Sequence, residues 1–355
     1  MLTSGQCIRF FAGSLGTVVG GRGFLNCVWE LTYRCNARCF MCDYWQRPSE
    51  PQRELSTADI KTGLAKIAEH GCRLINFSGG EPTLRMDLED IVAFACERGM
   101  WTSVVTNGSH LTRARLARLR DAGPDSLFIS LDSLDPKRHD TNRGFPGLHG
   151  RVLECLDWLA DDFAVGHRIA GLMVIIGDEN LSEIAGLVET AASRGLWALV
   201  QPRHARKTGA GNHITAVSVS LVRSLLFSKE RTGSVLNSRG YLRALLDQGK
   251  DCTGSRCRAG EKYFSIGPYG YLHPCVDMPA AGHVLKDEIS VVCSASARAG
   301  VHACSGCRYC FKGEADATLS LGGCLEKAQL ALQIIRQDAK KRRSRKRARH
   351  WQRAV

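Results

Sequence analysis

Residues Thr32 to Trp45 read TYRCNARCFMCDYW and place three cysteines within eight positions. These are Cys35, Cys39 and Cys42, and no further cysteine follows until Cys72. Thiolates at such spacing typically hold zinc or an iron–sulfur cluster, and a closed structural site takes four ligands. The stretch therefore predicts a metal centre and leaves open which group supplies the fourth ligand.

Composition limits the class of protein. The chain has 355 residues, of which 44% are hydrophobic and 23% charged, which is typical of one large folded domain with a smaller one attached. No run is apolar for long enough to cross a bilayer, and the first residues lack the features of a secretory signal. We therefore expect a cytoplasmic protein. In that reducing compartment, sixteen cysteines favour metal ligation over disulfides.

The last third of the chain forms a second cysteine-rich region. Cysteines, glycines and turn residues replace helical periodicity there, which is typical of a small domain that a metal stabilises. A structural zinc site is the alternative to an iron–sulfur cluster, because Cys-x2-Cys pairs are common zinc ligands. The cysteines of this region are Cys252, Cys257, Cys275, Cys293, Cys304, Cys307, Cys310 and Cys324.

The positive charge is concentrated at the C-terminal end. The formal net charge is +13, and residues 336–355 hold ten Lys or Arg against one Asp, so this tail carries +9 and the rest of the chain +4. Such a run either binds an acidic partner, nucleic acid or a membrane, or is a solvated extension.

Short strand-like runs alternate with amphipathic helical segments. Helical patterns cover Ser56–Glu69, which begins with residues typical of a helix N-cap, and Leu111–Ala122. Six strand–helix units predict a parallel α/β architecture, closed or partly closed. The strands are expected at Val28–Thr32, Leu74–Ser78, Thr102–Thr106, Ser126–Ser130, Ala170–Ile175 and Ala198–Gln201.

A polar or glycine-rich motif follows each of the first four strands. The cysteine loop follows the first, Gly79–Gly80–Glu81–Pro82 the second, Asn107–Gly108 the third and Asp132 the fourth. Ligands of parallel α/β folds bind at the carboxyl ends of the strands. We expect these motifs to converge on one site.

The spacing Cys35-x3-Cys39-x2-Cys42, followed by Gly79–Gly80–Glu81–Pro82, resembles the radical S-adenosylmethionine (radical SAM) enzymes from Val28 to about Gln201. The resemblance implies a [4Fe–4S] cluster with one open iron, to which S-adenosylmethionine binds. It also implies reductive cleavage of that cofactor to a 5′-deoxyadenosyl radical, which abstracts hydrogen from a substrate. The cofactors would carry this chemistry, and the protein would supply orientation and shelter.

The resemblance also implies contacts to the cofactor. Glycines permit close backbone approach in the Gly79–Pro82 segment. At Asn107 and at the pair Ser130 and Asp132, a turn or helix cap remains an alternative to a cofactor contact. Arg143 suits the methionine carboxylate, although it could instead face solvent. Asn180 is a further candidate, and Met41 stands where the family often has an aromatic residue.

The C-terminal third resembles the SPASM/twitch extensions that carry auxiliary iron–sulfur clusters. The match begins with Cys257 and with Gly270-x4-Cys275 and continues through Cys304, Cys307 and Cys310 to Cys324. Its middle departs from the full pattern, so one or two auxiliary clusters are implied and individual ligands are not assigned. We include Cys252 among the candidate metal ligands.

For the whole chain we predict an α/β fold, a partial (β/α)6 barrel of parallel strands with a C-terminal cysteine-rich iron–sulfur domain. Residues 1–24 would form an N-terminal extension, 25–240 the radical SAM core, 241–335 the auxiliary domain and 336–355 a basic tail.

The expected function is radical SAM oxidation or another modification of a small metabolite or a peptide, with an external electron donor such as a flavodoxin or ferredoxin. The alternative is a zinc-stabilised nucleic-acid-binding protein. Because the barrel starts within the first thirty residues, we expect no fused leader-peptide-binding domain, which favours a small metabolite or a peptide delivered by a separate partner. No substrate-contacting or catalytic residue is assigned.

Overall fold

One mostly parallel sheet organises the molecule. The structure is a computed structural model that describes residues 24–166, 168–203, 217–246, 257–302, 304, 309–318, 322–323 and 325–334. Among these residues the strand order is β6-β5-β4-β3-β2-β1-β7-β8-β9, and β1 to β6 are mutually parallel. The sheet does not close, so the predicted partial barrel of parallel strands is confirmed. The strands are β1 Asn26–Glu30, β2 Leu74–Ser78, β3 Trp101–Thr106, β4 Ser126–Ser130, β5 Ile169–Ile176, β6 Trp197–Pro202, β7 Tyr263–Ile266, β8 Tyr271–His273 and β9 Gly282–His283.

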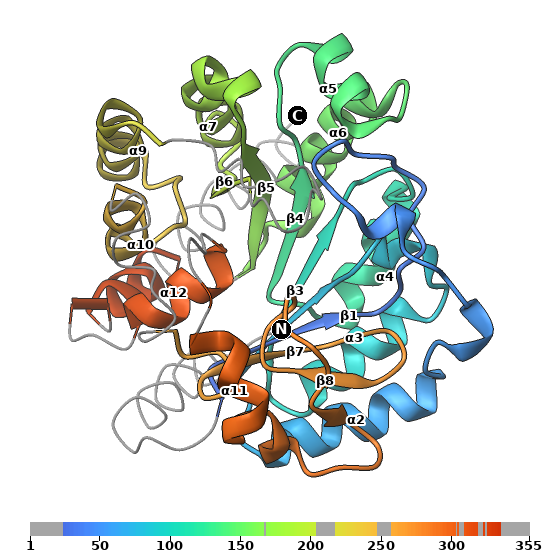
Figure 1. Ribbon diagram of the computed structural model, residues 1–355. Helices are drawn as coiled ribbons and strands as arrows, with labels where there is room; N and C mark the ends of the chain where they lie inside the picture. The colour runs from blue at the N-terminus through green and yellow to red at the C-terminus, as the bar shows by residue number, and fades with distance from the viewer. Residues whose placement is uncertain are drawn as a thin grey trace, which may run out of the picture.

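Helices lie around the outside of the strands (Figure 1). The longer ones are α2 Thr57–Glu69, α3 Leu88–Glu97, α4 Arg113–Ala122, α5 Pro136–Arg143, α6 Leu148–Trp158, α7 Ile184–Ala192, α9 Val219–Thr232, α10 Arg239–Ala244, α11 Ala295–His302 and α12 Cys310–Thr318. Short helical turns cover Tyr44–Gln46, Pro51–Arg53, Pro82–Leu84, Leu159–Phe163, Asp178–Glu183 and Ile289–Cys293. Residues 325–334 are also helical. No described helix is both long and apolar enough to span a membrane.

The alternation of side chains along β1 divides the core from the barrel interior. Cys27 and Trp29 belong to the main apolar core between sheet and helices, and Gly63 of α2 leaves room for the Trp29 ring. Asn26, Val28 and Glu30 point the other way, into the interior cavity. The same strand therefore stabilises the fold with one face and builds the site with the other.

The described part of the C-terminal third continues this sheet. Strand β7 pairs with β1 in parallel, and β8 and β9 add antiparallel neighbours. The cysteine-rich region is therefore attached to the barrel through backbone hydrogen bonds. The domain boundaries proposed above remain predictions, and residues 1–23 and the basic tail lie outside the described residues.

Most predicted strands and helices differ from the observed ones by one or two residues. The largest difference is in the first strand, which was predicted as Val28–Thr32 and ends at Glu30. The Thr32 hydroxyl accepts a hydrogen bond from the backbone N–H of Arg34 at 3.0 Å, which turns the chain at this point. Helix α2 begins as predicted, because Ser56 caps the N–H of Asp59.

Asp125 joins the starts of three neighbouring strands. Its carboxylate accepts the N–H of Thr102 at 2.8 Å, and its backbone carbonyl accepts the N–H of Ile169 at 2.8 Å. Burial raises the pKa of Asp125 from 3.8 to about 7. The folded protein therefore binds a proton that the unfolded chain releases between these two values, so this residue's contribution to stability falls as pH rises through that window.

We predict that Asp125→Asn removes this dependence, because the amide does not ionise and its oxygen still accepts from Thr102. Urea unfolding at pH 5 and pH 8 measures the effect. The wild type should lose more stability over this interval than the variant. The exposed Asp121→Asn change is the control and should behave as the wild type. An equal loss in Asp125→Asn and wild type contradicts the prediction.

Candidate active site

The motifs that follow the first three strands meet Ser130, the last residue of the fourth, at one cavity of about 1150 Å³ inside the barrel. The cysteine loop leaves β1, the glycine segment leaves β2, and Asn107 and Ser130 stand at the ends of β3 and β4. The lining includes Cys35, Cys39, Met41, Cys42, Gly79, Gly80, Glu81, Asn107, Ser130 and Arg143. The structure thus brings together most of the residues predicted from the strand-end pattern.

The three cysteines of the loop pack in one small apolar group. Cys39 is buried with Ala37 and Met41, while Cys35 and Cys42 pack against them from partly buried positions. Burial raises the pKa of the Cys35 thiol to about 12. Burial also raises the pKa of Cys39, and the Arg143 guanidinium opposes that shift. Thiols in this setting need a positive charge or a metal to become thiolates.

Backbone contacts hold the cysteine loop against the segment that follows β2. The N–H of Gly80 donates to Thr32 O at 2.7 Å, and the N–H of Glu81 donates to Arg34 O at 2.8 Å. A Cβ atom at Gly79 or Gly80 would collide with these same carbonyl oxygens. The glycines are therefore required by the packing of the two loops, whatever ligand their backbone also meets.

The Glu81 carboxylate connects the ends of β2 and β3. It accepts hydrogen bonds from the N–H and hydroxyl of Thr83, from the Thr106 hydroxyl at 2.7 Å and from the N–H of Asn107 at 2.7 Å. Glu81 is 1% exposed. Four donors on one buried carboxylate fix both strand ends at the edge of the cavity.

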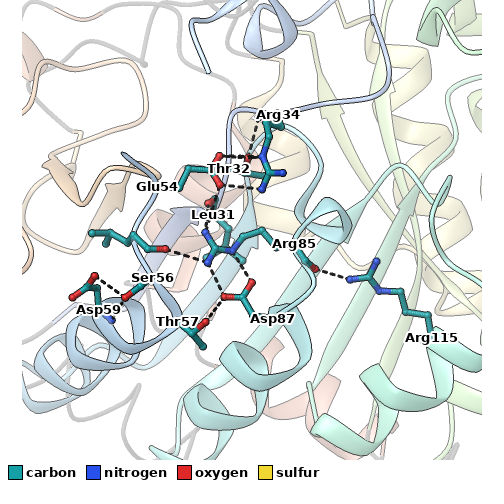
Figure 2. Close-up of polar contacts among 11 residues, drawn as sticks. Leu31, Thr32, Arg34, Glu54, Ser56, Thr57, Asp59, Arg85, Asp87 and Arg115 are labelled. Atoms are coloured by element: carbon teal, nitrogen blue, oxygen red, sulfur yellow. Dashed lines mark hydrogen bonds and ion pairs between the residues drawn. The ribbon is translucent and has the colours of Figure 1, made fainter. Parts of the chain in front are cut away.

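A partly buried network of ion pairs and hydrogen bonds holds the chain that leads into the cysteine loop (Figure 2). Arg85 donates to Leu31 O and Leu55 O and pairs with Asp87 at 2.7 Å. Glu54 pairs with Arg34 at 3.1 Å and also accepts from the Thr32 hydroxyl. The chain before Cys35 is thereby tied to the segment after β2 through Arg85 and to the segment before α2 through Glu54.

Arg143 is the basic group next to the cysteines. Its Nη1 donates to Cys39 Sγ at 3.8 Å, and its guanidinium pairs with the buried Asp132. Its Nε is buried and has no hydrogen-bond partner among the described residues. Asn180 lies behind the cavity wall. Its side-chain NH2 donates to the carbonyls of Asp132 and Ile175, and its side-chain oxygen accepts from the N–H of Gly177. Neither Asp132 nor Asn180 lines the cavity.

Comparison with known proteins identifies the domain that carries this site. Residues 29–191 match the family model described as the radical SAM superfamily. This part of the chain is a radical SAM domain. The matched stretch contains the cysteine loop, the glycine segment, Glu81 and Arg143.

Two curated relatives and one solved structure show how far the radical SAM similarity extends. The chain is 31% identical to the PqqA peptide cyclase of Rhodopseudomonas palustris, covering 69% of this chain and 65% of that protein. It is 29% identical to the Fe-coproporphyrin III synthase of Methanosarcina barkeri, over 64% of this chain and 56% of that protein. The crystal structure of Streptococcus suis SuiB bound to S-adenosylmethionine has a TM-score of 0.65 at 16% identity, covering 79% of this chain and 68% of that one. The last comparison shows a shared fold.

The cavity fits the group that the radical SAM family binds. Among the described residues no three His, Cys, Asp or Glu side chains meet closely enough to hold one metal ion. An iron–sulfur cluster does not require three side chains around one metal ion, because each cysteine binds a different iron of the cluster. The donor set consists of three thiols around one cavity beside an arginine whose Nε has no partner in the described part of the chain. This set suits a cluster with an anionic ligand on its open iron.

Met41 and Phe40 have different environments in the radical SAM loop. Met41 is 7% exposed and lines the cavity. Phe40 is 48% exposed and contacts the guanidinium of Arg203. Met41 therefore occupies the inward position of the loop, and the neighbouring aromatic ring does not replace it there.

A second group of cysteines lies apart from the first. Cys257, Cys275 and Cys304 border one small cavity and pack against Tyr263 and Met278. Burial raises the pKa of Cys275 to about 12. Among the remaining candidates, Cys310 lines the large cavity instead, and its N–H donates to Gln201 at 2.8 Å. Cys252, Cys307 and Cys324 lie outside the described residues.

Sequence reasoning did not single out Glu30 and Tyr44 on the cavity wall. Both are 4% exposed and line the cavity, and the Tyr44 hydroxyl donates to the Glu30 carboxylate. A signal was available for Glu30, since an acidic residue within a buried parallel strand is uncommon. Arg85 was missed as well, and its role follows from contacts that only the folded chain shows.

We predict that Gly80→Ala destabilises the loop and lowers the iron content of the purified protein, because the added Cβ meets Arg34 O. Iron and sulfide analysis with thermal unfolding measures both effects. Gly150→Ala in α6 is the matched control, because a Cβ there meets nothing within 4 Å. Iron content equal to the control would contradict the packing role of Gly80.

Proposed function

We propose that the chain is a radical SAM enzyme that modifies an organic substrate inside the barrel. The observation that carries the proposal is the arrangement of Cys35, Cys39 and Cys42 on the same cavity wall as the Gly79–Glu81 segment. When bound, a [4Fe–4S] cluster with S-adenosylmethionine at its open iron supplies a 5′-deoxyadenosyl radical for hydrogen abstraction from an unactivated C–H bond.

Each part of the chain has a separate task in this proposal. The three cysteines hold the cluster, and Arg143 offers its guanidinium to the carboxylate of S-adenosylmethionine while remaining paired with Asp132. Asn107 and Ser130 border the same cavity and are the proposed polar contacts to that cofactor. Asn180 acts through its hydrogen bonds to the neighbouring backbone, which fix the end of β5.

The cavity wall supplies the shelter that radical chemistry needs. Strands β4 to β6 contribute Phe128, Ile169, Met173 and Leu199, and the helical residues 325–334 add further apolar side chains. Such a wall excludes water from the reacting atoms and offers few polar groups that compete for the substrate.

The second cysteine group is the proposed auxiliary cluster site. Cys257, Cys275 and Cys304 border one cavity, which supports three thiolate ligands for it. A fourth ligand would come from the other candidate cysteines, and a second auxiliary cluster would need more of them. Because Tyr309 and Cys310 line the substrate cavity, the cysteine-rich region also helps to form the active site.

The substrate is proposed to be a peptide or a small organic molecule. Curated relatives include a PqqA peptide cyclase and an AdoMet-dependent heme synthase, the latter 27% identical over 73% of this chain. The cavity of about 1150 Å³ has room for a cofactor and part of a substrate. An external low-potential electron donor, such as a flavodoxin or ferredoxin, is the proposed partner.

The first test replaces Cys35, Cys39 and Cys42 together with alanine. We expect the loss of about four irons per chain, the content of one [4Fe–4S] cluster, and no 5′-deoxyadenosine under reducing conditions. Cys96→Ala, which changes an isolated partly buried thiol, is the control and should retain both. Formation of 5′-deoxyadenosine by the triple variant at the wild-type rate would sink the proposal.

The second test concerns the auxiliary site. A soluble Cys275→Ala variant should lose about four irons per chain, and combining it with the triple variant should remove the remainder. Cys293→Ala is the control, because this exposed cysteine belongs to the same region and does not border the small cavity. Full iron content in Cys275→Ala would show that Cys275 is an ordinary buried thiol.

A further inference from the structure

The charged side chains on the wall of the large cavity differ in the number of ion-pair and hydrogen-bond partners that they have. Arg143 pairs with Asp132, Arg203 with Glu179, and Glu314 with Lys327. Glu81 accepts four hydrogen bonds. Glu30 is the remaining charged group on the described wall. The charged residues that line the cavity are Glu30, Glu81, Arg143, Arg203, Glu314 and Lys327.

Glu30 is the last residue of β1 and points into the cavity. Its Oε1 accepts the hydroxyl of Tyr44. Among the described residues, no other group donates a hydrogen bond to Glu30 and no cation forms an ion pair with it. Arg47 is the nearby base. Its charge interacts with Glu30 without direct contact, and its ion pair, at 3.0 Å, is with Asp43. Its guanidinium lies over the Tyr44 ring.

A carboxylate in this position retains the capacity to accept further hydrogen bonds. An ionised carboxyl group has about four acceptor sites, and Tyr44 fills one of them. Burying such a group is unfavourable unless a donor or a cation compensates it. On the described wall Tyr44 is the one donor to Glu30, whereas each of the five other charged groups has an ion-pair partner or several donors.

The wall on the other side of the barrel is apolar. Phe128, Ile169 and Trp197 are buried in one cluster with Ile334, and Trp101 packs against them. Most of these side chains line the same cavity as Glu30. A ligand that fills the cavity therefore meets an anionic end at β1 and an apolar surface at β4 to β6.

We propose that Glu30 binds a protonated amine or guanidinium of the substrate, whose apolar body lies against the β4–β6 wall. This inference rests on the proposed function, because it treats the cavity that borders Cys35, Cys39 and Cys42 as the substrate site. Tyr44 orients the carboxylate through the hydrogen bond that its hydroxyl donates, and the substrate nitrogen occupies remaining acceptor positions of Glu30.

The test compares three small probes that share a phenyl group and differ in charge. These are 2-phenylethylamine, 2-phenylethanol and 3-phenylpropanoate, measured by anaerobic equilibrium dialysis against the cluster-loaded protein. Excess S-adenosylmethionine is present without reductant, so that its own subsite is filled. We expect the amine to bind at least about tenfold more tightly than the alcohol, and the carboxylate to bind most weakly, because a charge-assisted hydrogen bond is lost or reversed.

Variants assign this preference to Glu30. Glu30→Gln should reduce the amine-to-alcohol ratio of affinities to near one, whereas Tyr44→Phe keeps the carboxylate and should keep the preference. Glu97→Gln is the matched control, because it makes the same change of charge at an exposed position on α3. If Glu30→Gln does not fold, the three probes on the wild type decide the question alone.

The outcomes separate this inference from the proposed function. Equal binding of amine and alcohol by the wild type, absence of saturable amine binding, or an unchanged preference in Glu30→Gln would overturn the role of Glu30. Failure of the wild type to form 5′-deoxyadenosine under reducing conditions would overturn the proposed function instead. If the protein cleaves S-adenosylmethionine but binds the three probes with equal affinity, the proposed function stands and only the role of Glu30 is rejected.

Discussion

The close contact between the cysteine loop and the segment after β2 is the constraint on which the site depends. Two backbone hydrogen bonds, from Gly80 to Thr32 and from Glu81 to Arg34, hold the two loops together. The Glu81 side chain then extends the connection to the end of β3. Three strand ends are thus fixed by one short segment, which limits how far the loop before Cys35 can move relative to the barrel.

This constraint explains why buried polar groups gather at the carboxyl edge of the sheet while the core behind the strands is apolar. Arg85, from the segment after β2, and Glu54, from the segment before α2, pair with each other and contact the chain before Cys35, and each has several partners. Removing one member of such a network would leave the others buried without compensation, which is more costly than losing one contact. The network therefore favours a single arrangement of the loop over several loose ones.

The strand pattern predicted much of this arrangement, because buried parallel strands are near-continuous apolar runs and each ended in a polar motif. It placed the cysteine loop, the Gly79–Glu81 segment and Asn107 on one cavity. It did not distinguish a group that lines the cavity from one that supports it, as Asp132 and Asn180 show. That difference depends on which neighbour a side chain reaches after folding, and spacing along the chain does not contain this information. For the same reason the role of Arg85 was not predicted, because the carbonyls of Leu31 and Leu55 that it contacts lie 54 and 30 positions away.

Strand β1 relates the two cysteine groups to each other. Leu25, just before this strand, packs in the apolar cluster that Cys257, Cys275 and Cys304 contact, and the cysteine loop begins just after its other end. Pairing of β1 with β2 on one side and β7 on the other fixes this strand by two ladders. The two groups are therefore positioned by the sheet rather than by flexible connections. Because Glu30 lies on the cavity face of the same strand, a substrate bound there would be held by the element that also sets the placement of both cysteine groups.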